Sequence, residues 1–283
     1  LMGFPTATVM AQTWDEKLIE LLGDAFGQEC MHAGVSELYA PCANMHRTPY
    51  GGRNWEYFSE DPFITGKMLA AESKGLQKRG VIVCAKHFAF NDQELNRCGV
   101  ATFLNEQTAR EIYLKGFEFG VTEGKVKSLM SSFPRLGCKW EGHYDGLMTD
   151  ILRKEWGFTG FVETDSAFGQ PYMTKPLARI EGVICGVDFW MDGAASMQFA
   201  GYENNATVVR AVREACHRML YAQTNSLIIN GMTTSNIVVY ETPWWVNAIS
   251  YAQVALGTVT GLLLAMSVAS FVVFALDNKK KEA

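Results

Sequence analysis

Short apolar runs alternate with segments of helical pattern between residues 13 and 224, in units of about 35 to 45 residues. Residues 81–85 form an unbroken apolar run, as expected of a strand that is buried on both faces. Parallel strands need crossover connections long enough to contain a helix, so strands separated by helices pair in a parallel sheet. The alternation therefore predicts an α/β fold.

The expected strands are residues 35–40, 81–85, 126–131, 160–164 and 187–191, and the expected helices are residues 13–34, 61–80, 106–123, 146–156, 176–185 and 205–224. Thr13 and Glu16 have the spacing of a capping box, and Asp61 followed by Pro62 has the pattern of an N-cap and a first helical residue. Five strands are too few to close an eight-stranded barrel. Either some strands escape this pattern or the chain starts inside the domain, and we expect the latter because residues 1–5 read as a loop.

The C-terminal segment has no charged residue between Glu241 and Asp277, and residues 254–276 are almost wholly apolar. A helix needs about 20 such residues to cross the hydrocarbon core of a bilayer. A pair of tryptophans and Tyr251 lie at its upstream edge, where aromatic rings favour the headgroup zone. We expect residues 244–276 to form one transmembrane helix, with a buried core helix or a hydrophobic dimerisation tail as the alternatives.

Lysines at positions 279, 280 and 281 follow this segment directly. Cytoplasmic flanks of membrane spans are rich in lysine and arginine, so the C-terminus is expected in the cytoplasm and the rest of the chain outside the cell membrane. The expected organisation is a domain at residues 1–232, a spacer at residues 233–243, the span at residues 244–276 and a basic tail at residues 277–283.

Composition excludes several classes of function. The net charge is −5 and no stripe of lysine and arginine is present, which argues against a nucleic-acid partner. The seven cysteines form no CxxC pair, and no group of histidine, cysteine and aspartate has metal-ligand spacing. No glycine-rich loop follows a strand as a phosphate cradle would. We therefore expect neither a metal nor a cofactor.

Polar side chains stand where the expected strands end. Arg53 follows the first strand by a long loop, Lys86 and His87 end the second, Phe133 with Arg135 ends the third, and Asp165 ends the fourth. In a βα barrel these points lie on one rim, the carboxyl-terminal face on which active sites are built. Each residue alone could be part of a structural ion pair, but their recurrence at the same point of the repeat favours a common site.

The residue types at this rim indicate the chemistry. A carboxylate flanked by cations stays ionised, which suits Asp165 as a nucleophile. Arginine and lysine present several hydrogen-bond donors, which suit the vicinal hydroxyls of a sugar. Lys86 has an alternative role as a Schiff-base lysine of the kind found in barrel aldolases.

Three segments carry a resemblance to a known family. Residues 52–62 read GRNWEYFSEDP, residues 86–97 read KHFAFNDQELNR, and residues 156–166 read WGFTGFVETDS. In order and spacing they resemble the signature segments of glycoside hydrolase family 3, and the resemblance extends from about residue 4 to residue 231.

The resemblance implies a (β/α)₈ TIM-like barrel that lacks its first strand. It also implies a retaining, exo-acting β-glycosidase of the β-glucosidase branch, in which Asp165 forms the covalent glycosyl-enzyme. The family's sugar-binding positions correspond to Arg53, Lys86, His87 and Arg97. Phe133 stands near the nucleophile, where the family usually has a tyrosine.

The acid/base glutamate of this branch lies on an αβα sandwich domain, which we expect upstream of residue 1 because domain-permuted members occur in the family. The expected substrate is an oligosaccharide or a β-glycoside. The alternative is a catalytically impaired, membrane-anchored carbohydrate-binding protein.

Overall fold

The computed structural model describes residues 3–192, 199–230 and 244–281. The chain divides into two compact units, Leu1–Thr233 and Thr234–Ala283, and each is considered by itself. The spacer expected at residues 233–243 lies outside the described residues.

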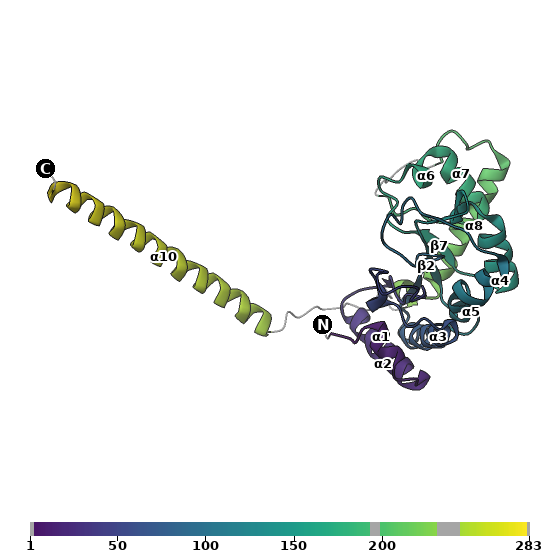
Figure 1. Cartoon of the computed structure of the whole chain (residues 1–283), viewed down its shortest axis with the longest axis horizontal. Helices are drawn as coiled ribbons and strands as arrows, with labels where there is room; N and C mark the ends of the chain where they lie inside the picture. The colour runs from purple at the N-terminus through teal and green to yellow at the C-terminus, as the bar shows by residue number, and fades with distance from the viewer. Residues whose placement is uncertain (1–2, 193–198, 231–243, 282–283) are drawn as a thin grey trace. The chain divides into compact units, whose positions relative to one another are not determined.

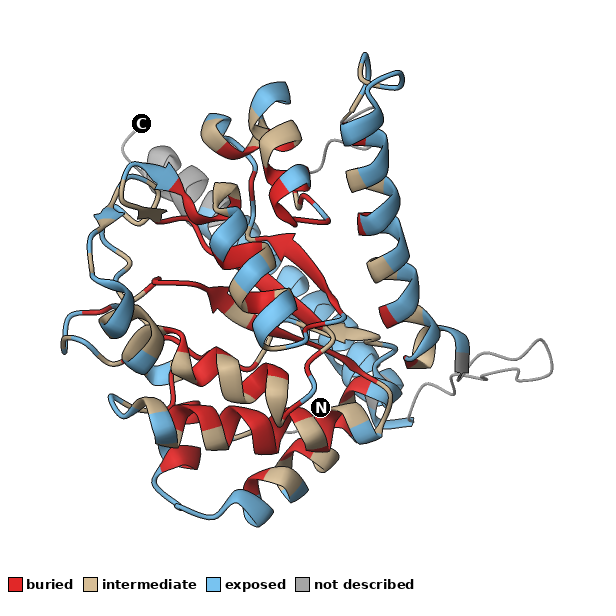
Figure 2. Ribbon diagram, turned by 90° about the vertical axis from the view of Figure 1, so that its right-hand side faces the viewer, coloured by how far each residue is buried: buried red, intermediate tan, exposed pale blue. Residues whose placement is uncertain are grey.

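The first unit is built on a four-stranded parallel sheet. Its strands, in spatial order, are β1 (Glu37–Leu38), β2 (Ile82–Phe88), β4 (Ser128–Ser131) and β7 (Phe161–Thr164). Glu163 of β7 also forms a parallel bridge with Phe189, inside the strand predicted at residues 187–191. Every residue of β4 and β7 is buried, as Figure 2 shows for the centre of the unit. The predicted α/β fold with a parallel sheet is confirmed.

Helices connect successive strands and cover the sheet (Figure 1). The long ones are α2 (Glu16–His32), α3 (Pro62–Lys78), α5 (Lys115–Thr122), the π-helical segment η4 (Gly146–Glu155), α7 (Pro176–Cys185) and α8 (Ala206–Thr224). The short ones are α1 (Ala7–Ala11), η1 (Asn54–Glu56), α4 (Glu106–Thr108), the π-helical turn η2 (Ala109–Tyr113), η3 (Glu141–His143), α6 (Pro171–Thr174) and α9 (Leu227–Asn230). Because one helical connection follows each strand, the carboxyl ends of all four strands face the same side.

An aspartate caps the start of both α2 and α3, but only the cap of α3 was predicted. Asp61 is the N-cap of α3, where its carboxylate accepts backbone N–H bonds of 2.7 and 3.1 Å, as predicted. The capping box expected at Thr13 was wrong, because Asp15 caps α2 with bonds of 2.9 and 3.1 Å. The Thr13 hydroxyl instead donates to the carbonyl of Met10, which closes the preceding turn.

Helices α2 and α3 pack with their backbones in contact. A Cβ atom on Gly23 would lie 2.5 Å from the carbonyl oxygen of Glu72, and one on Gly75 would lie 2.2 Å from that of Glu20. Neither distance is possible for a real side chain, so each helix needs glycine where it crosses the other. The loop that carries Arg53 runs from the strand before α3 to its start, so this helix pair anchors one side of the site.

A second sheet was not predicted. Its strands β3 (Ala101–Thr102), β5 (Arg135–Leu136) and β6 (Lys139–Trp140) have two residues each, too few to leave a periodic pattern. The turn between β5 and β6 brings the Trp140 indole N–H to the carbonyl oxygen of Ser132 at 2.7 Å. This bond fixes the segment that leaves β4, where Phe133 lies.

The second unit contains the helix α10 (Trp244–Lys281). Its stretch Asn247–Phe271 has 25 residues with a mean hydropathy of 1.9, which is long and apolar enough to cross a membrane. The helix predicted at residues 244–276 is present, but it continues to Lys281, so part of the predicted tail is helical.

Candidate active site

A cavity of about 310 Å³ lies at the carboxyl ends of the strands of the main sheet. Its lining residues are Tyr39, Arg53, Lys86, His87, Glu94, Arg97, Met130, Asp165 and Met191. Five of the six residues predicted from the sequence therefore meet in one pocket, and Phe133 is the exception.

An irregularity in β2 directs two consecutive side chains into this pocket. Lys86 pairs with Met130 of β4, but the next pair joins Phe88 to Ser131, so His87 is skipped. In a regular strand successive side chains point to opposite faces. A bulge suspends that alternation, and Lys86 and His87 both line the pocket as a result.

The Asp165 carboxylate follows β7 directly and has two different environments. Its Oδ1 accepts the backbone N–H of Ser166 at 2.7 Å. Its Oδ2 lies 3.5 Å from Nε2 of His87 and 3.9 Å from Nη1 of Arg97. The side chain is 16% exposed, so it is accessible from the pocket while most of its surface is covered. One oxygen is thus fixed by the backbone, and the other faces the His87 ring and the Arg97 guanidinium.

His87 is neutral in this setting. Its pKa lies well below the ordinary value, because burial disfavours the charged ring and Arg53, Lys86 and Arg97 repel it. Its Nε2 lies 3.2 Å from Nη1 of Arg53. A guanidinium can only donate, so Nε2 accepts and the ring proton is assigned to Nδ1. The backbone of His87 is held on both sides by the Asn44 side chain, at 2.8 and 3.0 Å.

Two carboxylates that sequence reasoning did not select hold the cations in place. Glu56 pairs with Nε of Arg53 and lies 3.6 Å from Nζ of Lys86. Burial raises the pKa of Glu56, but bonds from Arg53 and Cys42 outweigh this and bring it below the ordinary value. Glu94 lies 3.5 Å from Arg53 and 3.1 Å from Arg97.

Phe133 contributes to the site through Arg97. It is 4% exposed, and the guanidinium carbon of Arg97 lies 4.6 Å from the centre of its ring. A cation over an aromatic face is stabilised by the electron density of the ring. Phe133 therefore positions Arg97, although it does not line the cavity.

Tyr39, Met130 and Met191 were also missed by sequence reasoning. Tyr39 directly follows β1 as the structure has it, but it lies inside the strand predicted at residues 35–40, so the strand-end rule did not select it. Methionines carry no signal of a site, because they are common in any apolar core.

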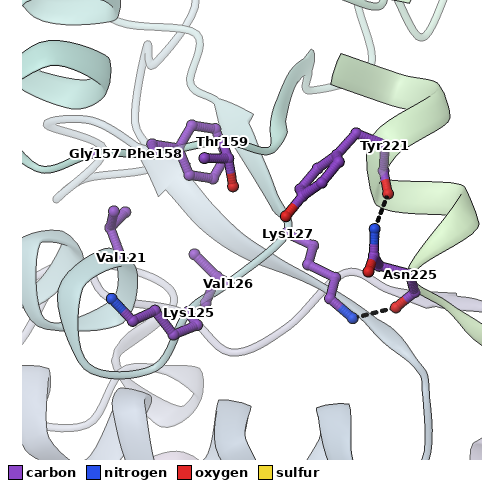
Figure 3. A pocket seen from close by; sticks show the side chains of 9 residues that line it. All are labelled: Val121, Lys125, Val126, Lys127, Gly157, Phe158, Thr159, Tyr221 and Asn225. Atoms are coloured by element: carbon purple, nitrogen blue, oxygen red, sulfur yellow. Dashed lines mark hydrogen bonds between the residues drawn. The ribbon is translucent and has the colours of Figure 1, made fainter. Parts of the chain in front are cut away.

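A cavity of about 260 Å³ lies at the opposite end of the strands (Figure 3). It is formed by the residues just before β4 and β7 and by the end of α8. Lys127 bonds there to the carbonyl of Asn225, whose amide donates to Tyr221 at 2.8 Å. The amino-terminal face of such folds usually serves stability, and these bonds join α8 to the sheet.

A parallel βα domain with a polar pocket at the carboxyl ends of its strands has the arrangement of barrel enzymes. Residues 2–220 match the family described as "Glycosyl hydrolase family 3 N terminal domain". The chain belongs to this family, and its fold is TIM-barrel-like. The resemblance stated from the three segments is confirmed.

Similar proteins are named as beta-glucosidases. Thermostable beta-glucosidase B of Acetivibrio thermocellus is 42% identical over 188 residues, which are 66% of this chain and 24% of that protein. Beta-glucosidase of Ruminococcus albus is 45% identical over 163 residues, which are 58% of this chain and 17% of that protein. The structure of beta-glucosidase 3B from Thermotoga neapolitana in complex with glucose has a TM-score of 0.71 and 36% identity, covering 81% of this chain and 33% of that one. The chain thus spans about a quarter of the curated relatives and a third of the solved structures.

Proposed function

We propose that this chain carries the nucleophile of a retaining, exo-acting β-glucosidase that hydrolyses oligosaccharides or β-glycosides. The observation that carries the proposal is the position of Asp165 in a pocket with Arg53, Lys86 and Arg97. The cations donate hydrogen bonds to the hydroxyls of the sugar, and Asp165 attacks the anomeric carbon to form a glycosyl-enzyme that water hydrolyses. The likeness to beta-glucosidases supports glucose as the sugar.

The general acid comes, in this proposal, from an αβα sandwich domain that precedes the chain. A general acid needs a carboxyl group free to carry and release a proton. Glu94, the other carboxylate among the described residues that line the pocket, is occupied, since it bonds to Arg53, Arg97 and Asn91. Glu56, behind them, is held by Arg53 and Lys86. A separate acid is consistent with this arrangement.

A mechanism-based label tests the proposal on the full-length protein. A 2-deoxy-2-fluoro-β-glucoside with a good leaving group should trap the glycosyl-enzyme, and mass spectrometry should place the label on Asp165. Asp165→Ala should remain unlabelled, whereas Asp150→Ala, which removes an exposed carboxylate outside the pocket, should be labelled like the wild type. A folded wild-type protein that neither takes the label nor hydrolyses aryl β-glucosides would contradict the proposal.

A carbohydrate-binding protein without catalysis is the second candidate. The occupied Glu94 favours it, because no other carboxyl group among the described residues that line the cavity is available to protonate the leaving group. Calorimetry separates the two candidates. The binding protein should take up glucose in the Asp165→Ala variant as in the wild type and should show no turnover.

We also propose that α10 anchors the protein in the cell membrane, with the first unit outside and the C-terminus in the cytoplasm. The apolar stretch Asn247–Phe271 and the lysines after it support this orientation. The full-length protein should resist extraction by alkaline carbonate, and a variant that ends at residue 233 should be soluble. Digestion of a C-terminal epitope by external protease on intact cells would overturn the orientation.

A further inference from the structure

Three strands of the main sheet place potential metal ligands directly under the sugar pocket. They are Glu37 on β1, Cys84 on β2 and Glu163 on β7. Each precedes a pocket-lining residue by two positions, so it shares that residue's face of the sheet and lies about 6.6 Å lower along the strand. The three pocket residues are Tyr39, Lys86 and Asp165.

The ligand atoms of this cluster converge. One carboxylate oxygen of Glu37, Sγ of Cys84 and one carboxylate oxygen of Glu163 all lie within 4.8 Å of one another. Cys84 is 0% exposed and Glu163 is 1% exposed. Side chains from three separate strands therefore direct polar atoms to one buried point.

Several of these polar atoms have no hydrogen-bond partner among the described residues. They are Oε1 of Glu37, Oε1 of Glu163 and Oγ of Ser128, none of which forms a hydrogen bond of good geometry. The only polar groups that these atoms approach are one another, Cys84 and Tyr39, so the described part of the cluster is satisfied from within or not at all. A buried oxygen without a partner costs about 1 to 3 kcal/mol, so each such group calls for an explanation such as an ion. Three at one point indicate a shared cation.

The charges of the cluster are also uncompensated. Neither Glu37 nor Glu163 forms an ion pair with a cationic side chain in the described part of the chain. Two carboxyl groups held together in the interior need either a shared proton or a bound cation.

We propose that Glu37, Cys84 and Glu163 bind one Zn²⁺ ion beneath the sugar pocket. A cysteine ligand selects zinc over Mg²⁺ and Ca²⁺, which prefer oxygen ligands. The Ser128 hydroxyl or a water supplies a fourth position for tetrahedral coordination. Because the thiol and both carboxyl groups lose their protons to the metal, binding releases protons and tightens as the pH rises. The site is independent of the proposed glucosidase activity.

Metal content and a cobalt spectrum test the site without any substrate. The full chain, purified without chelators and passed through a desalting column after incubation with ZnSO₄, should hold one zinc per chain by elemental analysis. The metal-free chain titrated with CoCl₂ should develop a thiolate-to-cobalt absorption in the near ultraviolet. Cys84→Ser should abolish this absorption and weaken zinc binding by at least about 100-fold.

Matched variants separate this site from other thiols. Cys185→Ser, on a buried cysteine of α7, and Cys138→Ser and Cys216→Ser, on exposed ones, should all keep the absorption and the zinc. Glu163→Gln preserves the size of the side chain and provides a second variant if Cys84→Ser does not fold, as judged by circular dichroism. It should keep the thiolate absorption only at higher cobalt concentration. A folded wild-type chain without zinc or cobalt absorption, or loss of the absorption in Cys138→Ser or Cys216→Ser, overturns the proposal.

Discussion

Replacing Asp188 by asparagine should destabilise the first unit strongly, because this side chain ties three elements together. Its carboxylate is 0% exposed and accepts bonds from Nη2 of Arg153 at 2.8 Å and from Arg218 at 2.6 and 2.9 Å. It also accepts the backbone N–H of Val162 in β7 at 2.8 Å. One carboxylate thus joins η4 and α8 to the strand that carries Asp165.

The expected cost follows from what the substitution leaves behind. Arg153 and Arg218 are only 12% and 18% exposed, so without Asp188 two guanidinium groups remain largely buried without their anion. Burial already lowers the pKa of Arg153 to about 10, against the attraction of Asp188. Removing one partner of a buried ion pair costs about 3 to 5 kcal/mol. Since asparagine retains one acceptor oxygen, we expect a loss of about 3 kcal/mol in the free energy of unfolding.

Urea unfolding of the full chain in detergent micelles, followed by tryptophan fluorescence at pH 7, measures this loss. The matched control is Asp150→Asn, since Asp150 and Lys154 also pair at 2.7 Å but are 52% and 68% exposed. The control should cost less than about 1 kcal/mol, because exposed pairs contribute little. Amide exchange at Val162 should accelerate in Asp188→Asn alone. The reasoning is refuted if the two variants lose the same stability.

Further predictions concern pH and close packing. Burial raises the pKa of Glu72 to about 7, so the fold is stabilised below pH 4.5, where this carboxyl group is neutral. The free energy of unfolding should fall by about 3 kcal/mol as the pH rises through 7. Urea unfolding should show this fall in the exposed control Glu214→Gln but not in Glu72→Gln. Burial lowers the pKa of His87, so the free energy of unfolding should fall as the pH drops below 6.5, by up to about 1.4 kcal/mol per pH unit. The variant His87→Asn should lack this pH dependence in the same assay. Gly160→Ala should destabilise the fold by about 3 kcal/mol, because the new Cβ would lie 2.1 Å from a backbone carbonyl oxygen. A Cβ at Gly146 meets nothing within 4 Å, so Gly146→Ala should change stability by less than about 1 kcal/mol. Equal thermal stability of the two variants would contradict this.

Local signals in the sequence were sufficient for some elements. Helix α7 begins and ends where predicted, because Pro176 fits a first helical position and Gly186 adopts a left-handed φ of 118° just after the end. Strand β1 is shorter than predicted. The Ala40 N–H bonds to the carbonyl of Leu38, and Pro41 has no N–H to offer the neighbouring strand, so regular pairing stops after Leu38. Isolated bridges from Cys42 to Lys86 and to Tyr57 follow.

Some residues of the candidate site could likewise be predicted from the sequence, and others could not. Arg53, Lys86, His87 and Asp165 could be selected because they stand at or after the ends of predicted strands, and the strand ends converge. Arg97 was selected only through the family resemblance. The cluster under the pocket had no such signal. Its three ligands lie inside three different strands, β1, β2 and β7, where buried residues of any type are expected, so only the fold shows that they meet.

The skipped residue in β2 has a consequence for how this site can change over time. The orientations of Lys86 and His87 depend on the register of the backbone against β4 as well as on the identity of the side chains. Inserting or deleting one residue in this strand would exchange the faces of the sheet to which the following side chains point. Single substitutions keep that register intact. The lining of this pocket can therefore change by the exchange of one amino acid for another at constant strand length, whereas insertions belong in the loops beyond the strand.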